Sequence, residues 1–249
     1  MNPVLQEIER TGTTLLSSGE RTQVRAHVDA ASGDVLRRAV EATQPRVACE
    51  VGLAFGVSTL HILDAMKHSG DGVLLGMDPS QHSETWRGGG LANVQRAGFA
   101  DRYRFHEETS QACLPRLAAA GTRIQFAFLD GWHTFDHTLV DFFYVDQMLD
   151  VGGIVVLDDV GYPGLQRLAH FIVTNRAYEF FDGASRPAPS GWRQHAKRSV
   201  QAALRPLVRD NFTPGDEACK LKLRVDGCKL VALRKRADDG RSYNHFAAF

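Results

Sequence analysis

The sequence predicts an α/β protein with a doubly wound, mostly parallel sheet and an antiparallel hairpin at one edge. Between residues 46 and 159, five short apolar segments of strand length alternate with segments of helix length. This alternation is typical of a parallel sheet with helices on both faces. Further along, KLKLRVDGCKLVALRK at 220–235 alternates apolar and polar residues on either side of Asp226-Gly227, which indicates a hairpin.

The remaining elements can be placed in chain order. Residues 1–45 show roughly helical spacing of apolar residues, and Pro45 ends this helical segment because proline disrupts a helix interior. The five strands are expected at 46–53, 72–78, 102–108, 124–130 and 153–159. The intervening helices are expected at 56–70, 90–100, 110–121 and 138–153. A helix at 164–176 and a short strand at 178–181 precede the hairpin.

Composition and charge argue against several classes of partner. The chain has 249 residues, with 29 Lys and Arg balancing 29 Asp and Glu, so neither nucleic acid nor an anionic membrane is expected as its main partner. The first residues lack the basic start and apolar core of a secretory signal, and no apolar run reaches membrane-spanning length. With only four cysteines, we expect a reduced, cytoplasmic protein.

A glycine-containing loop follows the first expected strand, where open parallel sheets bind their ligands. Gly52 and Gly56 allow a tight turn and a close approach of a ligand to the backbone. The helix after them presents free amides at Ser58 and Thr59. The loop departs from the pyrophosphate-binding pattern G-x-G-x-x-G, because the middle glycine is absent and an acid, Glu50, precedes the first glycine.

Asp78 ends the second expected strand. An acid at this place, some twenty residues beyond the glycines, is suited to accept hydrogen bonds from both hydroxyls of a ribose. The alternative is that Glu50 and Asp78 only cap helices and that the glycines only turn the chain. Together the loop and the acid favour a nucleoside site.

Three acids follow the fourth and fifth expected strands. Asp130 closes the fourth, and Asp158 and Asp159 close the fifth. If these strands are near neighbours in the sheet, their carboxylates converge, and each raises the pKa of the others unless a cation lies among them. Oxygen ligands with room for water suit Mg²⁺, with Mn²⁺ or Ca²⁺ as alternatives.

The stretch EVGLAFG at 50–56 resembles the first motif of class I S-adenosylmethionine-dependent methyltransferases, E/D-x-G-x-x-x-G. The resemblance implies a seven-stranded, mostly parallel Rossmann-like sheet, and it implies that the acid and the glycine turn hold the amino-acid half of S-adenosylmethionine. It also implies that Ser110, after the third strand, contacts the adenine. Ser110 is equally a good helix N-cap.

The run from Asp130 to Asp159 resembles the metal-dependent O-methyltransferases, in particular the group of macrocin-type sugar methyltransferases and cephalosporin-hydroxylase-like proteins. Catechol and caffeoyl-CoA O-methyltransferases are more distant. Asp130, the pair Gly152-Gly153 and the pair Asp158-Asp159 match their pattern, and the resemblance covers about residues 46–180. It implies that Asp130 lies beside the cofactor and binds Mg²⁺ with Asp158 and Asp159.

Two residues just beyond Asp130 carry further expectations. His133 is placed to act as general base on an acceptor hydroxyl, since its unperturbed pKa is near neutral, and the relatives place a lysine or histidine base at this offset. Trp132 offers a flat face to the adenine, or alternatively packs under its loop. His137 and Asp136 are expected to be structural.

Residues 46–249 are expected to form the methyltransferase domain. Residues 1–45 would be a helical lid or a contact in a homodimer, and 183–216 a lid insertion. A basic helix at 192–209 within that insertion is either a solvated face or part of the acceptor site.

The function expected from the sequence is metal-assisted methyl transfer from S-adenosylmethionine to a hydroxyl of a small metabolite, of sugar or phenol type. The alternatives are a metal-independent O- or N-methyltransferase and, less favoured, a non-catalytic protein that binds the cofactor. An NAD-dependent oxidoreductase is disfavoured because G-x-G-x-x-G is missing.

Overall fold

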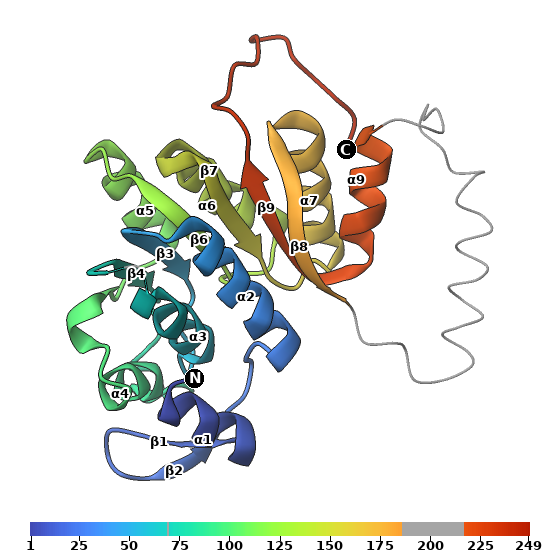
Figure 1. Cartoon of the computed structure of the whole chain (residues 1–249). Helices are drawn as coiled ribbons and strands as arrows, with labels where there is room; N and C mark the ends of the chain where they lie inside the picture. The colour runs from blue at the N-terminus through green and yellow to red at the C-terminus, as the bar shows by residue number, and fades with distance from the viewer. Residues whose placement is uncertain (69, 186–216) are drawn as a thin grey trace, which may run out of the picture.

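A seven-stranded sheet forms the centre of the protein in this computed structural model, which describes residues 1–68, 70–185 and 217–249 (Figure 1). The strand order is β5-β4-β3-β6-β7-β9-β8. The five parallel strands are β3 (Val47–Val51), β4 (Val73–Met77), β5 (Tyr103–His106), β6 (Ile124–Leu129) and β7 (Leu149–Leu157). β8 (Tyr178–Ser185) and β9 (Cys228–Lys235) complete the sheet, and β9 runs antiparallel to both β7 and β8. The predicted doubly wound, mostly parallel fold is confirmed.

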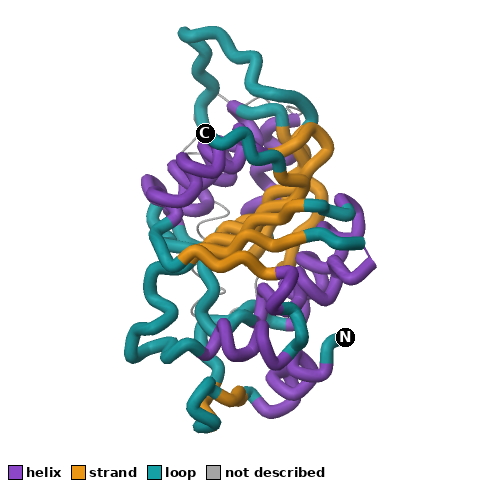
Figure 2. The backbone as a smooth tube through the Cα atoms, turned by 90° about the vertical axis from the view of Figure 1, so that its left-hand side faces the viewer, coloured by secondary structure: helices purple, strands orange, loops and turns teal. Residues whose placement is uncertain are grey.

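Successive residues of the central strands point to opposite faces of the sheet, and each face is buried under its own helices. On one face, Phe126 and Phe128 belong to the same apolar cluster as residues of α1 (Pro3–Thr11), α2 (Ala30–Thr43), α3 (Val57–Ala65) and α4 (Gly89–Arg96). On the other face, Ala127 and Leu129 pack with α5 (Ser110–Ala119), α6 (Phe135–Met148), α7 (Pro163–Asn175) and α9 (Glu217–Asp226). Figure 2 shows helices on both sides of the sheet.

The expectation of helix throughout residues 1–45 is wrong. Gly12 adopts a left-handed backbone with φ of 65° and ends α1, its amide donating to the Ile8 carbonyl. The β-branched threonines that follow favour extended backbone, and β1 (Thr13–Leu15) pairs antiparallel with β2 (Arg21–Gln23). The Thr14 hydroxyl donates to Oδ1 of Asn93 in α4 over 2.5 Å. This hydrogen bond links the two-stranded sheet to the helices that cover the large sheet.

The predicted hairpin at 220–235 is also wrong in its first half. Residues 217–226 form α9, and the antiparallel partners of β9 are β7 and β8. Both edges of β9 are therefore occupied, and 220–226 has no strand to pair with. Leu221 and Val225, four residues apart, instead pack on the second apolar cluster, as one face of a helix does.

Two other boundaries can be compared. β7 begins at Leu149, so α6 ends before the glycine pair rather than at it. The expected basic helix at 192–209 and most of the expected lid insertion at 183–216 lie outside the described residues. Within the described part of the chain, no helix is long and apolar enough to cross a membrane.

Candidate functional site

A pocket of about 970 Å³ lies at the carboxyl ends of the central strands. Loops after β3, β4, β6 and β7 and the start of α5 contribute to its walls. Most of the residues singled out by the sequence line it: Gly52, Ser58, Asp78, Ser110, Asp130, Trp132, His133, Asp158 and Asp159. Glu50, Gly56 and Thr59 are not among its lining residues.

Gly52 brings the glycine loop into contact with the loop after β6. Its φ of 92° lies in the region that disfavours other residues, and its amide donates to the Met77 carbonyl over 2.9 Å. A Cβ at this position would lie 2.1 Å from the backbone oxygen of Asp130. The glycine loop and the loop after β6 can approach this closely because residue 52 has no side chain.

Glu50 is fully buried and fastens the start of α3. Its two carboxylate oxygens accept hydrogen bonds of 2.6 Å from the Ser58 and Thr59 hydroxyls. Burial raises the pKa of Glu50 to about 7, although these two hydrogen bonds act in the opposite direction. The structure thus places Glu50 outside the pocket wall, where it supports the start of α3, and the cofactor contact expected for it stays a prediction.

Asp78 lines the pocket and also holds the glycine loop in place. Its Oδ2 accepts from the amides of Leu53 and Ala54 over 3.1 and 3.2 Å, and its Oδ1 accepts from the Ser80 amide over 2.7 Å. Gln81 adds a second support that the sequence did not reveal, because its side-chain amide donates to the Ala54 carbonyl over 2.8 Å. The acid at the end of β4 therefore links two loops that border the predicted nucleoside site.

The acids after β6 and β7 surround His133. Its Nε2 lies 3.6 Å from Oδ1 of Asp130 and 4.0 Å from Oδ2 of Asp159. Asp159 has a left-handed backbone with φ of 48°, a strained conformation for a residue other than glycine and one that recurs at functional sites. Asp158 is buried, and its Oδ1 has no hydrogen-bond partner among the described residues.

Electrostatic repulsion accompanies this arrangement. Burial, and then the charges of Asp158 and Asp159, raise the pKa of Asp130 well above its ordinary range. Burial likewise raises the pKa of Asp158. Lys229, at the start of β9, lines the same pocket and opposes both effects. Its Nζ lies 3.7 Å from Oδ2 of Asp29.

The donor set fits a hard dication. A buried carboxylate oxygen without a partner is a free ligand, and carboxylate oxygens are the ligands that Mg²⁺ prefers. No choice of one oxygen each brings Asp130, Asp158 and Asp159 all within 4.8 Å of one another. Binding one ion through all three would therefore require these side chains to move closer together.

The aromatic residues of the loop after β6 lie at the rim of the pocket. Trp132 is 70% exposed, which rules out the alternative that its indole packs under the loop. His137, expected to be structural, lines the pocket and lies with its ring centroid 6.3 Å from that of Trp132. Ser110 is the first residue of α5, whose N-cap is Thr109, so the capping alternative for Ser110 is also wrong.

Several pocket residues escaped the sequence analysis. Ala26, His27 and Val28, from the link between β2 and α2, form part of the wall, and so does Lys229. They lie far in sequence from the carboxyl ends of the parallel strands and carry no motif. Only the three-dimensional arrangement brings them to the site.

Comparisons with known proteins agree with this fold. Residues 49–160 match the family model described as a methyltransferase domain. Similar solved structures include an O-methyltransferase from Bacillus cereus in complex with SAH, at 16% identity and a TM-score of 0.55, covering 94% of this chain and 92% of that chain. The O-methyltransferase TomG from Streptomyces achromogenes, involved in tomaymycin synthesis and in complex with SAM, gives 16% identity and a TM-score of 0.55, covering 95% and 91%.

A third similar structure is the SAH-bound methyltransferase PaMTH1 from Podospora anserina, at 15% identity and a TM-score of 0.55, covering 95% of this chain and 89% of that chain. A search of curated proteins finds no match. Identities this low support the fold alone, whereas the domain match covers the glycine loop and all three acids. The chain therefore carries a methyltransferase domain at residues 49–160, on a sheet like that of the S-adenosylmethionine-dependent methyltransferases among the similar structures.

Proposed function

We propose that the protein is an O-methyltransferase that transfers the methyl group of S-adenosylmethionine to a hydroxyl of a small metabolite, of sugar or phenol type. A divalent cation, Mg²⁺ or a similar ion, would be held by Asp130, Asp158 and Asp159, and His133 would act as general base. The observation that carries the proposal is the position of the His133 imidazole between two carboxylates at the wall of the cofactor pocket.

His133 is suited to receive a proton at Nε2. Distances of 3.6 and 4.0 Å to the carboxylate oxygens are too long for hydrogen bonds. With Nδ1 protonated, Nε2 therefore keeps its lone pair for an acceptor hydroxyl that enters between these groups. Once the proton is transferred, Asp130 and Asp159 stabilise the imidazolium by their negative charge.

S-adenosylmethionine supplies a methyl group on a sulfonium, and the acceptor oxygen displaces the sulfur, which leaves with the electron pair of the broken bond. Held by these acids, a dication would supply polarisation that lowers the pKa of the acceptor hydroxyl. The contribution of the chain is alignment: the glycine loop and Asp78 hold one reactant, and the loop after β6 holds the other. At about 970 Å³ the pocket is at the upper end for small-molecule sites, which favours room for cofactor and acceptor together.

The test is methyl transfer from labelled S-adenosylmethionine to a panel of catechols and hydroxylated sugars, before and after exhaustive chelation with EDTA. We expect chelation to abolish transfer and Mg²⁺ to restore it. A second candidate, metal-independent transfer, is favoured by Lys229, whose ammonium group already opposes the charge of the acids. Transfer that survives chelation without any effect of added Mg²⁺ would establish that candidate instead.

His133 is tested by substitution. We expect His133→Ala to bind S-adenosylhomocysteine as the wild type does but to lower turnover by on the order of a hundredfold or more. His245→Ala serves as the matched control, because His245 lies exposed in the C-terminal tail and lines no part of the pocket. Equal turnover in the two variants would remove His133 from the mechanism.

A further inference from the structure

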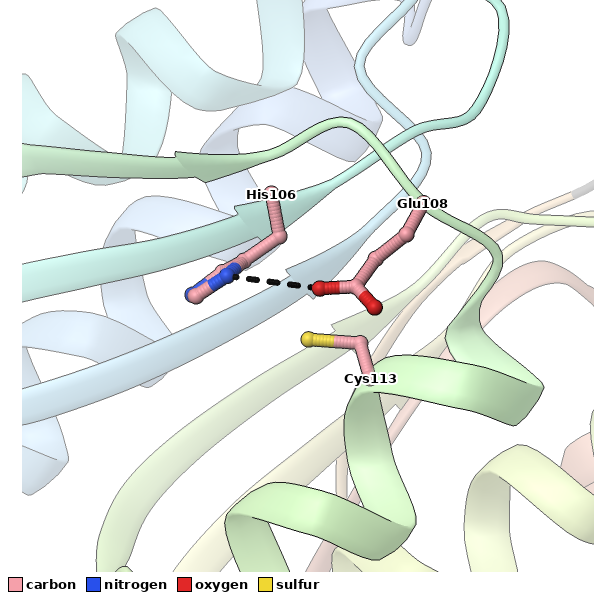
Figure 3. Close-up of side chains that lie close together, drawn as sticks. All are labelled: His106, Glu108 and Cys113. Atoms are coloured by element: carbon pink, nitrogen blue, oxygen red, sulfur yellow. Dashed lines mark ion pairs between the residues drawn. The ribbon is translucent and has the colours of Figure 1, made fainter.

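A second group of potential metal ligands lies around the start of α5, the helix that contributes Ser110 to the pocket. His106, Glu108 and Cys113 are shown in Figure 3. One ligand atom from each, an imidazole nitrogen, a carboxylate oxygen and a sulfur, can be chosen so that all three lie within 4.8 Å of one another. In the described part of the chain, these are the residues that meet this spacing. We propose that they form a site for a thiophilic dication of the Zn²⁺ class, distinct from the acidic site.

The scaffold of this site is well anchored at both ends. His106 is the last residue of β5, and its carbonyl accepts a hydrogen bond of 3.2 Å from the Asp78 amide. Cys113 lies in the first turn of α5, where its amide donates to the Thr109 carbonyl over 3.0 Å. Glu108 lies in the short link between the two elements, with its Oε1 3.7 Å from Nδ1 of His106. The three ligands thus belong to one strand, loop and helix unit.

The chemical character of the donors selects the ion. Zn²⁺ binds imidazole nitrogen, carboxylate oxygen and thiolate sulfur at about 2.0–2.3 Å in a tetrahedron, and water completes a site with three protein ligands. Mg²⁺ prefers oxygen alone, so the acidic site and this site would take different metals. His106 and Glu108 are partly exposed, which leaves a path from solvent for the ion and for the water ligand.

Cys113 enters such a site as a thiolate. Metal binding releases the thiol proton to solvent, because a bound dication deprotonates a coordinating thiol. The sulfur is fully buried in the absence of the ion, which protects it from competing reactions in water.

Arg116 is the side chain that opposes the ion. Its guanidinium is hydrogen-bonded to Glu108 and lies 3.8 Å from the sulfur of Cys113. About half of the Arg116 side chain is exposed, so its ion pair with Glu108 is weak and the guanidinium can move into solvent at little cost. Removal of this positive charge should strengthen cation binding.

The position of the site connects it to the cofactor pocket. Thr109, Ser110 and Gln111, which lie between Glu108 and Cys113 in the chain, all line that pocket. An ion held by residues on both sides of this segment would fix its conformation where the adenine is expected. The proposal itself concerns ion binding and does not depend on the metal-assisted mechanism proposed above.

The experiment is a titration of the full chain with Co²⁺, whose bond to a cysteine thiolate gives a charge-transfer absorption in the near ultraviolet. We expect the wild type to develop this band with one Co²⁺ per chain and to lose it when Zn²⁺ is added. Cys113→Ser should abolish the band. Cys228→Ala, which removes another buried cysteine, should retain it.

Three further variants make the result decisive. His106→Gln keeps the thiol and should weaken Co²⁺ binding by about tenfold or more. Arg116→Ala should bind Co²⁺ more tightly than the wild type. Asp158→Asn, which disables the acidic site, should leave the band unchanged, so that failure of the metal-assisted mechanism and failure of this site can be told apart. No thiolate band at saturating Co²⁺, a band that survives Cys113→Ser, or one lost with Asp158→Asn would overturn the proposal.

Discussion

Replacement of Glu50 by glutamine tests whether burial of this carboxyl group raises its pKa and lowers the stability of the folded protein at neutral pH. The side chain is fully buried, and its carboxylate oxygens accept hydrogen bonds from the hydroxyls of Ser58 and Thr59. Burial raises its pKa to about 7, from an ordinary value of 4.5. Glutamine has nearly the same shape, keeps an oxygen to accept one of these hydrogen bonds, and carries no charge.

The magnitude follows from linkage between protonation and folding. An acid whose pKa is raised in the folded state contributes stability that is fully present below pH 4.5 and is lost as the pH rises through about 7. Since each pKa unit corresponds to about 1.4 kcal/mol, ionised Glu50 destabilises the folded state by about 3 kcal/mol at pH 8. The stability of Glu50→Gln relative to wild type should therefore increase by about this amount between pH 4.5 and pH 8.

The assay is urea unfolding of both proteins at intervals from pH 4.5 to pH 8.5, compared as the difference in free energy of unfolding. The difference cancels the other titrating groups that the two proteins share. Glu84→Gln is the matched control, because Glu84 is exposed and its difference from wild type should stay flat. An equally flat difference for Glu50→Gln would refute the reasoning about its burial.

Three further predictions concern the pocket. Gly52→Ala should destabilise the protein by more than about 1 kcal/mol, because its Cβ would lie 2.1 Å from the Asp130 carbonyl; thermal unfolding measures this, and an unchanged melting temperature would contradict it. Trp132→Ala should leave stability within about 0.5 kcal/mol of wild type, yet weaken S-adenosylhomocysteine binding on the order of tenfold by calorimetry, since the exposed indole is proposed to stack on the adenine. Asp158→Asn should stabilise the cation-free protein by about 1 kcal/mol at pH 8 in urea unfolding, because it removes a buried charge. A variant less stable than the wild type would contradict the placement of a buried carboxylate oxygen without a partner at Asp158.

The sheet and the location of the pocket were predictable because their signals are local. A short apolar run followed by glycines, or by an acid, is visible within about ten residues, and the carboxyl ends of parallel strands share one edge of a sheet. Hence Asp78, Asp130, Asp158 and Asp159 were placed correctly at the pocket.

The errors arose where tertiary contacts decide between two local possibilities. The segment 220–226 alternates like a strand, but Leu221 and Val225 also lie on one face of a helix, and β9 already has β7 and β8 as partners. For Glu50, the sequence indicates an acid before the glycines but not that the hydroxyls of Ser58 and Thr59 would bind both of its oxygens.

The contributions of His27 and Lys229 to the pocket could not be predicted either, because they too depend on tertiary contacts. His27 lies in the link between β2 and α2, and Lys229 lies near the start of β9, so both are distant in sequence from the carboxyl ends of the parallel strands. Lys229 is brought there because β9 inserts between β7 and β8, and its carbonyl accepts a hydrogen bond of 2.8 Å from the Val160 amide just beyond Asp159. No motif spans that distance.

The proposed function depends on a divalent cation held beside the cofactor by the acids after β6 and β7. The most direct measurement is electron paramagnetic resonance of Mn²⁺ titrated into the complex with S-adenosylhomocysteine, comparing the wild type with Asp158→Asn. We expect one bound Mn²⁺ in the wild type and a large loss of affinity in the variant, because Asp158 provides the buried oxygen that has no partner among the described residues. Equal Mn²⁺ binding by the two proteins, or none by the wild type, would contradict it.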